Sequence, residues 1–170
     1  MTIQNINLLG SQQCKSCIAS IILRIVSFPR EASPRSILSP HSKWYTHHKR
    51  ILIVDDSDST RGLVREFLES KPDFEVCGEA TDALEGIEKG HELKPDVIVL
   101  DFSLPSMDGL KVAVILHEVV PSAPIILFTF YKDAIPLGIA QASGVASVIS
   151  KGDQLTTLAD EVHRLTGWTN

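Results

Sequence analysis

The sequence contains only three cysteines and lacks a long apolar run. Cys14, Cys17 and Cys77 are too few for the disulfide framework of a small secreted domain, so a reduced, cytoplasmic chain is the simplest expectation. The most apolar stretch near the N-terminus, residues 18–28, is shorter than the roughly 18 residues that a membrane-spanning helix needs, and Arg24 lies in its middle. It also lacks a clear small-residue cleavage site. The sequence therefore predicts neither a membrane span nor a secretory signal.

Charge is distributed unevenly along the chain. Residues 1–49 carry six basic side chains and one acidic side chain, whereas residues 50–170 carry ten basic and twenty acidic ones. An acidic body argues against direct binding to nucleic acid by the folded part. The composition, with 44% hydrophobic and 22% charged residues, is ordinary for a globular protein, and 170 residues suit one domain plus an extension.

Residues 1–48 have no sustained hydrophobic period and are rich in serine, with three prolines in their second half. We predict a basic leader that is disordered or poorly ordered. An organelle transit peptide and a misassigned start codon stay open as alternatives. A zinc site is a weaker hypothesis, because the spacing of its candidate ligands fits no common zinc pattern. These ligands are Cys14 and Cys17 with His41, His47 or His48.

From Lys49 onward, short aliphatic segments alternate with amphipathic ones. The aliphatic segments are predicted strands, at residues 50–54, 74–80, 95–100, 125–128 and 145–149. The amphipathic segments are predicted helices, at residues 59–69, 82–91, 108–119, 133–142 and 152–165. Five strands that are each followed by a helix predict a doubly wound α/β domain over residues 49–168, with a five-stranded parallel sheet flanked by five helices.

Three local features refine these predicted helices. Thr81 is the expected N-cap of the second helix, with Glu85 in its first turn, and Pro136 is expected to disturb the fourth helix. The first helix carries a predicted buried face of large apolar side chains. These are Leu63, Val64, Phe67 and Leu68.

Acidic side chains follow two of the predicted strands. Asp55 and Asp56 come directly after the first strand, and Asp101 comes directly after the third. In an open parallel sheet, ligands bind outside the carboxyl ends of the strands, so we expect these three carboxylates to meet at one edge. Thr129 and Lys151 follow the fourth and fifth strands, and the same rule brings them to this edge.

Three clustered carboxylates need a positive partner. Two unit charges about 4 Å apart repel by about 1 kcal/mol in water and by about 4 kcal/mol at an effective dielectric of 20. Mg²⁺ prefers oxygen ligands and commonly combines one or two carboxylates with waters and a phosphoryl oxygen. Lys151 would hold a phosphate as a fixed positive charge, and Thr129 would offer a hydroxyl donor. The sequence thus predicts a site of phosphoryl transfer in which a carboxylate is the nucleophile.

The same residues resemble the receiver domain of bacterial two-component response regulators. The resemblance covers about residues 50–167 and includes five motif positions at compatible spacings. These are Asp55-Asp56, Asp101 with the Leu104–Gly109 turn, Thr129 and Lys151. The resemblance implies a CheY-like, flavodoxin-like fold with the strand order 2-1-3-4-5.

The resemblance also implies a role for each motif position. Asp101 would be the phospho-acceptor, and Thr129 and Lys151 would bind the phosphoryl oxygens. The Mg²⁺ ligands would be Asp55, Asp56, Asp101 and the backbone carbonyl of Ser103. A sensor histidine kinase or a histidine phosphotransfer protein would donate the phosphoryl group. The fourth helix, fifth strand and fifth helix of the domain would form the surface that changes on phosphorylation and contacts a downstream protein. Such a stand-alone receiver would not be an enzyme beyond catalysing its own phosphorylation and dephosphorylation.

Three positions depart from the family pattern. Val148 stands where receivers often carry an aromatic residue, so the usual coupling between Thr129 and an aromatic rotamer is not expected. Phe130 stands where a small residue is usual, and a large ring beside Asp101 predicts slow phosphorylation by small donors and a long-lived phospho-state. Gly152 replaces the proline that commonly follows the lysine, so no cis X-Pro bond forms there. The Lys-Gly pair resembles receivers with a helix-turn-helix output domain, although no such domain is expected here.

Two other functions stay open. The segment Asp56–Thr60 fits the Asp-x-Asp-x-Thr signature of haloacid-dehalogenase-type phosphatases, in which Asp56 would be the nucleophile and Asp58 the acid and base. Such enzymes usually need a larger fold and a further acidic pair late in the chain. The departures at Phe130 and Val148 suggest instead a receiver-like module that binds its partners without phosphorylation.

Overall fold

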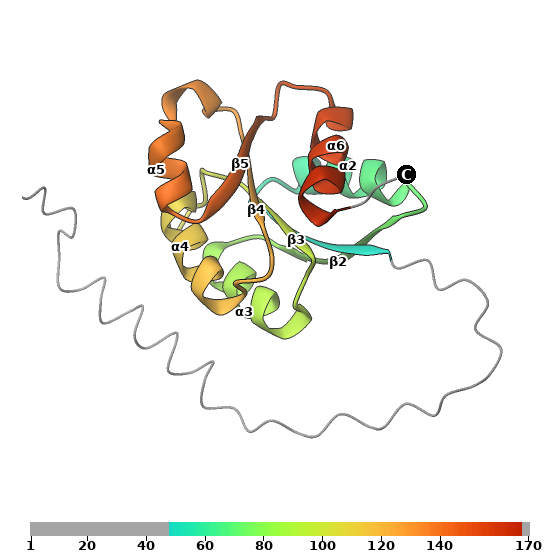
Figure 1. Ribbon diagram of the computed structural model, residues 1–170, viewed down its shortest axis with the longest axis horizontal. Coiled ribbons are helices and arrows are strands. Elements are labelled where there is room, and N and C mark those ends of the chain that lie inside the picture. Colours follow the sequence, from blue (N-terminus) through green and yellow to red (C-terminus); the bar gives the residue numbers. More distant parts are fainter. Residues whose placement is uncertain (1–47, 168–170) are drawn as a thin grey trace, which may run out of the picture. The chain divides into compact units, whose positions relative to one another are not determined.

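The computed structural model describes residues 48–167, in which helices lie on both sides of one sheet (Figure 1). The strands are β1 (Lys49–Val54), β2 (Phe74–Ala80), β3 (Val97–Leu100), β4 (Ile125–Thr129) and β5 (Val145–Ser150). The helices are α2 (Asp58–Glu69), α3 (Ala83–Leu93), α4 (Gly109–Val119), η1 (Lys132–Ala134, a 3₁₀ turn), α5 (Leu137–Ala142) and α6 (Leu155–Thr166). The predicted leader and the zinc hypothesis for Cys14 and Cys17 fall on residues outside this range.

All strand pairs in the sheet are parallel, and the strand order is β2-β1-β3-β4-β5. This confirms the predicted doubly wound fold and its order. Val54 pairs with Leu100 across β1 and β3, and Leu100 pairs with Leu127 of β4. The central strands therefore end nearly level with one another. Residues that directly follow them emerge at the same edge of the sheet.

The helices form two layers around the sheet. Figure 1 shows α2 and α6 on one face, with α3, α4 and α5 on the other. Successive side chains of a strand point to opposite faces, so Ile51 and Ile53 of β1 face the first layer. There they join a buried core with Val64 and Leu68 of α2 and Val162 of α6. Burial on both faces explains why β1 and β3 are almost purely aliphatic.

On the other face, α3 packs very close to β1. Leu52 and Val54 are fully buried there. A Cβ atom on Gly86 of α3 would lie 2.8 Å from Cγ1 of Val54, which is closer than carbon atoms normally approach. Glycine at this position therefore sets the distance between the helix and the sheet.

Two local predictions need adjustment. Asp82, not Thr81, is the N-cap of α3, because its side chain accepts a hydrogen bond from the main-chain N–H of Glu85. The Glu85 carboxylate in turn accepts from the N–H of Thr81 at 2.7 Å, so both residues help to close the helix start. Pro136 does disturb the fourth predicted helix, which is divided into η1 and α5.

The predicted buried face of α2 is only partly correct. Val64 and Leu68 are buried, but Leu63 is 60% exposed. The buried position next to them belongs to a charged residue, Arg61. None of the helices within residues 48–167 is long and apolar enough to cross a membrane.

Candidate functional site

The three predicted carboxylates meet at the C-terminal edge of the sheet. Asp101 continues the ladder beyond β3, since its main-chain N–H donates to the carbonyl of Val54 at 2.8 Å. Asp55 follows β1 in the same way and donates to the carbonyl of Ala80 at 3.0 Å. One carboxylate oxygen from each of Asp55, Asp56 and Asp101 lies within 4.8 Å of the other two. Asp55 and Asp101 are buried, whereas Asp56 is exposed.

Lys151 neutralises part of this negative charge. Its Nζ lies 2.7 Å from Oδ2 of Asp55 and 2.9 Å from Oδ2 of Asp101, and its side chain is only 6% exposed. Burial alone would lower the pKa of Lys151, but the hydrogen bonds that it donates to the two carboxylates outweigh this effect and raise the pKa. The ammonium is therefore fully charged at neutral pH.

Burial acts differently on the carboxylate beside it. Desolvation raises the pKa of Asp55, and the hydrogen bond from Lys151 opposes this shift only in part. The remaining Asp55 oxygen, Oδ1, accepts a hydrogen bond from the main-chain N–H of Ser57 at 2.9 Å. Desolvation of the buried Asp55 carboxylate therefore outweighs the stabilisation of its ionised form by Lys151 and Ser57.

Thr129 and Ser103, the other predicted site residues, lie at the end of β4 and on the loop after β3. Thr129 ends β4 and is fully buried, and its main-chain carbonyl accepts a hydrogen bond from the N–H of Lys151 at 2.9 Å. Its Oγ1 accepts from the N–H of Tyr131 at 3.1 Å, so the hydroxyl hydrogen can point elsewhere. Ser103 is exposed and forms an isolated antiparallel bridge with Asp108, the N-cap of α4.

The loop after Asp101 folds tightly back onto the strand end. The N–H of Gly109 donates to the carbonyl of Phe102 at 2.8 Å. A Cβ atom on Gly109 would lie 2.4 Å from the carbonyl oxygen of Asp101, which no side chain can occupy without moving the backbone. The glycine of the predicted turn is thus required for the close approach of α4 to the candidate acceptor.

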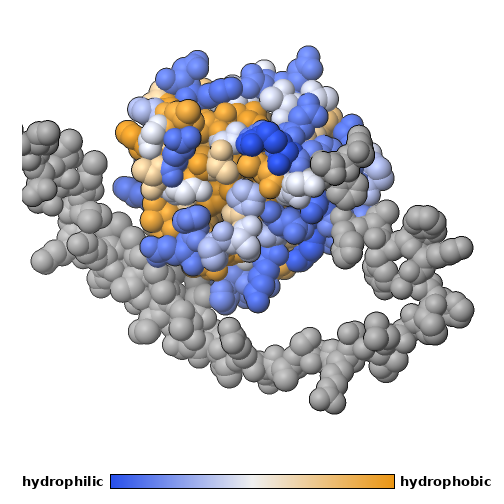
Figure 2. All heavy atoms as spheres, viewed as in Figure 1, coloured by the Kyte–Doolittle hydropathy of each residue, from blue (hydrophilic) through white to orange (hydrophobic). Residues whose placement is uncertain are grey.

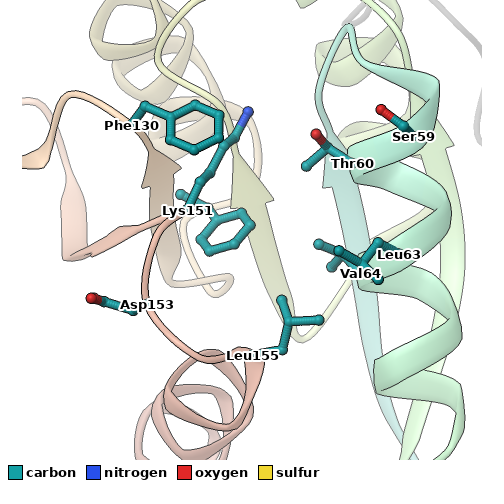
Figure 3. A pocket seen from close by; sticks show the side chains of 9 residues that line it. Ser59, Thr60, Leu63, Val64, Phe130, Lys151, Asp153 and Leu155 are labelled. Carbon is teal, nitrogen blue, oxygen red and sulfur yellow. The ribbon is translucent and has the colours of Figure 1, made fainter.

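A partly open cavity of about 260 Å³ adjoins the lysine, between α2 and the loop that joins β5 to α6. Figure 3 shows Phe130 and Lys151 side by side, with Ser59 and Thr60 of α2 across the cavity. The Phe130 ring centroid lies 5.6 Å from the Lys151 Nζ, and the ring is 73% exposed. Phe130 therefore lies against the lysine that contacts Asp101, and its expected effect on the rate of phosphorylation stays a prediction.

The sequence analysis missed Arg61. It lies in the first turn of α2, it is 8% exposed, and its Nη1 donates to the main-chain carbonyl of Asp55 at 2.7 Å. Its spacing could have revealed it, because Arg61, Val64 and Leu68 recur at the i, i+3, i+7 period of one helix face. An arginine in that series indicates a buried charge that needs partners.

The donor set suits a hard divalent cation. Three carboxylates and one ammonium leave a formal charge of about −2, and all candidate ligand atoms are oxygens. The exposed Asp56 leaves access from solvent, which a cation that keeps several of its waters needs. Asp55, Asp56 and Asp101 are therefore the residues that fit Mg²⁺ in this structure.

Comparison with known proteins identifies the class. Residues 51–163 match the family model of the response regulator receiver domain, which is more than half of the chain. The chain belongs to this family, whose members are signalling domains of two-component systems.

The sequence is similar to part of the length of several longer proteins. It is 35% identical over 119 residues to protein-glutamate methylesterase/protein-glutamine glutaminase 3 of Geobacter sulfurreducens, which covers 68% of this chain and 32% of that enzyme. It is 33% identical over 113 residues to the transcriptional regulatory protein LiaR of Bacillus subtilis, which covers 66% of this chain and 54% of LiaR. The chain thus spans about a third and about half of these relatives.

Solved structures show the same fold. The response regulator domain of Thermotoga maritima CheB has a TM-score of 0.65 at 25% identity, covering 72% of this chain and 99% of that one. A CheY-like receiver domain protein from Methanospirillum hungatei has a TM-score of 0.64 at 25% identity, covering 71% of this chain and 94% of that one.

Proposed function

We propose that the chain is a phospho-accepting signalling domain in which Asp101 receives a phosphoryl group from a histidine kinase or a histidine phosphotransfer protein. The observation that carries the proposal is the pairing of Lys151 with Asp101 at 2.9 Å inside a cluster of three carboxylates. Membership of the receiver family supports it. The acidic body favours signalling by protein contact over direct binding to nucleic acid, and the cytoplasm is the proposed location.

The reaction is a transfer between two nucleophiles. A carboxylate oxygen of Asp101 attacks the phosphorus atom, an O–P bond forms, and the bond from phosphorus to the donor nitrogen breaks with its electron pair leaving on the donor. The buried Lys151 ammonium is already next to the attacked position and pairs with the added negative charge. The Thr129 hydroxyl hydrogen is proposed to turn toward a phosphoryl oxygen.

Asp55, Asp56, Asp101 and the Ser103 carbonyl are the proposed ligands of Mg²⁺. When bound, this cation would neutralise charge on the phosphoryl oxygens and on the clustered carboxylates. The protein's own share is to hold Asp55 and Asp101 at fixed directions through Lys151, and to keep both of them away from bulk water. The phosphoryl group would then bias α5, β5 and α6, the surface predicted to contact a downstream protein.

The direct test is to incubate the full chain with acetyl phosphate and Mg²⁺ and to map the labelled residue. We expect label on Asp101, none in Asp101→Asn, and none after removal of Mg²⁺. Asp153→Asn is the matched control, because Asp153 lies beside the same cavity and pairs with Lys132 instead. Unchanged labelling of Asp101→Asn would overturn the proposal.

The labelling experiment also tests the phosphatase alternative, and a second measurement tests the alternative of a module that binds without phosphorylation. Label on Asp56, or repeated turnover of small phosphate esters, would support the phosphatase hypothesis for Asp56 and Asp58. The structure disfavours it, since Asp58 is exposed and is paired with Arg61. Beryllofluoride, which mimics a phosphoryl group, should shift the NMR signals of residues 145–152. No shift would support a module that binds partners without phosphorylation.

A further inference from the structure

Arg61 is a buried cation directly behind the acidic cluster. Burying a guanidinium is unfavourable unless it is paired and hydrogen-bonded, so a buried arginine on the core face of a helix calls for an explanation. Within residues 48–167, the Nε of Arg61 is the one buried side-chain nitrogen or oxygen that lacks a hydrogen-bond partner. Arg61 is thus a buried charged residue on a helix face whose other buried members, Val64 and Leu68, belong to the hydrophobic core.

Three groups hold the guanidinium in one orientation. Glu79 at the end of β2 places Oε2 3.4 Å from Nε, and Asp58 accepts a hydrogen bond from Nη2. Nη1 is thereby directed at the main-chain carbonyl of Asp55, 2.7 Å away. The planar fork of arginine suits this task, because it can serve several acceptors at fixed angles.

The contact with Asp55 also holds the loop that carries the candidate metal ligands. The N–H of Asp55 donates to the carbonyl of Ala80, its carbonyl accepts from Arg61, and its Oδ1 accepts from the N–H of Ser57. The main chain of Asp55 is therefore held on both sides. Asp56 is joined to that carbonyl directly, so the Arg61 bond fixes part of the backbone from which both carboxylates project.

We propose that Arg61 is a positioning residue, which aims Asp55 and Asp56 at the point they share with Asp101 and so sets the affinity of the site for Mg²⁺. The inference rests on the proposed function, which supplies the cation. The direction of the change in Mg²⁺ affinity distinguishes a positioning role of Arg61 from a simple charge effect. Removing a nearby positive charge would by itself tighten the binding of a cation, whereas loss of positioning weakens it.

The test compares Arg61→Met, Arg61→Lys and Arg65→Met in the full chain. Arg65 is the matched control, because it lies on the same helix and also pairs with Glu79, at 2.5 Å, but it belongs to the exposed face. The Mg²⁺ dissociation constant is measured by NMR titration of the unphosphorylated protein. Amide hydrogen exchange of Ser57 is measured without metal, and urea unfolding checks that each variant is folded.

We expect Arg61→Met to weaken Mg²⁺ binding by about tenfold, as is typical when a residue that orients metal ligands is lost, and to speed exchange of the Ser57 amide. Arg61→Lys keeps the charge but loses the fork, so it should shift both readouts in the same direction, and it decides the matter if Arg61→Met does not fold. Arg65→Met should bind Mg²⁺ within twofold of wild type.

Three outcomes would each overturn the inference. They are unchanged or tighter Mg²⁺ binding in the Arg61 variants, an equal loss of Mg²⁺ affinity in Arg65→Met, and unchanged hydrogen exchange of the Ser57 amide in the Arg61 variants. A wild-type chain that binds Mg²⁺ but takes up no phosphoryl group would instead overturn the proposed function, and the Arg61 comparison would still be decided.

Discussion

Lys151 and Asp101 form an ion pair of 2.9 Å in which both side chains are more than nine-tenths buried. The positive charge thus already lies against the candidate acceptor before any phosphoryl group arrives. A site built in this way needs little rearrangement to stabilise added negative charge, because its cation is in place and shielded from water.

Replacement of Lys151 should lower the stability of the fold, because the clustered carboxylates then repel one another without a cation. In Lys151→Met, Asp55 and Asp101 lose the cation that both contact, and we expect the free energy of unfolding to fall by about 3 kcal/mol at pH 7 in the absence of metal. Adding Mg²⁺ should recover part of the loss, because it neutralises the same carboxylates. Urea denaturation measures both effects. Lys132→Met, which removes an exposed ion pair with Asp153, should cost less than about 0.5 kcal/mol, and an equal effect of the two variants would contradict this account.

The start of α3 should give a pH-dependent contribution to stability. The hydrogen bond from Lys89, followed by the one from the Thr81 N–H, lowers the pKa of Glu85 to about 2. A depressed carboxylate pKa stabilises the fold above the unfolded value, near 4.5, and this contribution is lost as the pH falls toward 2. Glu85→Gln should therefore reduce stability at pH 7, by about 0.5–1 kcal/mol for an exposed cap, and the difference from wild type should shrink below pH 4.

Thermal unfolding as a function of pH measures that difference. Glu88→Gln, at an exposed position of the same helix, is the control and should leave the stability profile close to that of wild type. A gap between Glu85→Gln and wild type that stays constant from pH 7 to pH 3 would rule out the capping role.

Leu63 should matter for transfer from a protein donor and not for a small one. It is 60% exposed and lines the cavity beside Lys151, so a phosphodonor protein that reaches Asp101 from this side would cover it. Leu63→Glu should lower the rate of transfer from the best kinase found in a phosphotransfer screen by about tenfold, which corresponds to about 1.4 kcal/mol. Phosphorylation by acetyl phosphate should stay unchanged.

Leu84→Glu provides the comparison, because Leu84 is also exposed, at 47%, but lies on α3 in the opposite layer. Equal loss of transfer in both variants would indicate a general effect of added negative charge, and the proposed approach from the α2 side would be wrong.

Phe130 should slow the chemistry by covering Lys151. The ring lies 5.6 Å from the ammonium, and an exposed cation–π contact contributes about 0.5–1 kcal/mol. Phe130→Ala should therefore raise the rates of phosphorylation by acetyl phosphate and of dephosphorylation by about twofold to fivefold. Tyr131→Ala should change neither rate much, since Tyr131 contacts Phe102 rather than the lysine. Unchanged rates of phosphorylation and dephosphorylation in Phe130→Ala would contradict the proposed effect of the ring.

The sequence predicted the fold because its signals are local and repeated. Short aliphatic runs such as Val97–Leu100 are typical of strands covered on both faces, and their alternation with helices favours a parallel sheet. The exact ends of the helices were less predictable. Thr81 and Asp82 are adjacent and both can act as an N-cap, and only the backbone conformation decides between them. The exposure of Leu63 was not predictable either, since it depends on where α6 packs.

The sequence predicted the position of those site residues that directly follow a strand. Asp55, Asp101 and Lys151 were brought together by topology alone, and the structure adds only their distances. Arg61 was missed because its role depends on Glu79, a partner on another strand, and no local pattern connects the two. Ser103 lies on the loop after β3 and Thr129 ends β4, and the sequence did not specify the direction of their polar groups.

Helix α5 contains six residues and is bounded by Pro136 before it and by Gly144, with a φ angle of +82°, shortly after it. Helices of this length have little intrinsic stability, and Leu137 and Ile139 bury less than half of their surface here. Melting or re-forming this turn therefore changes the free energy of the domain by a small amount. A partner that prefers one of its two forms would need to contribute only modest binding energy to select it.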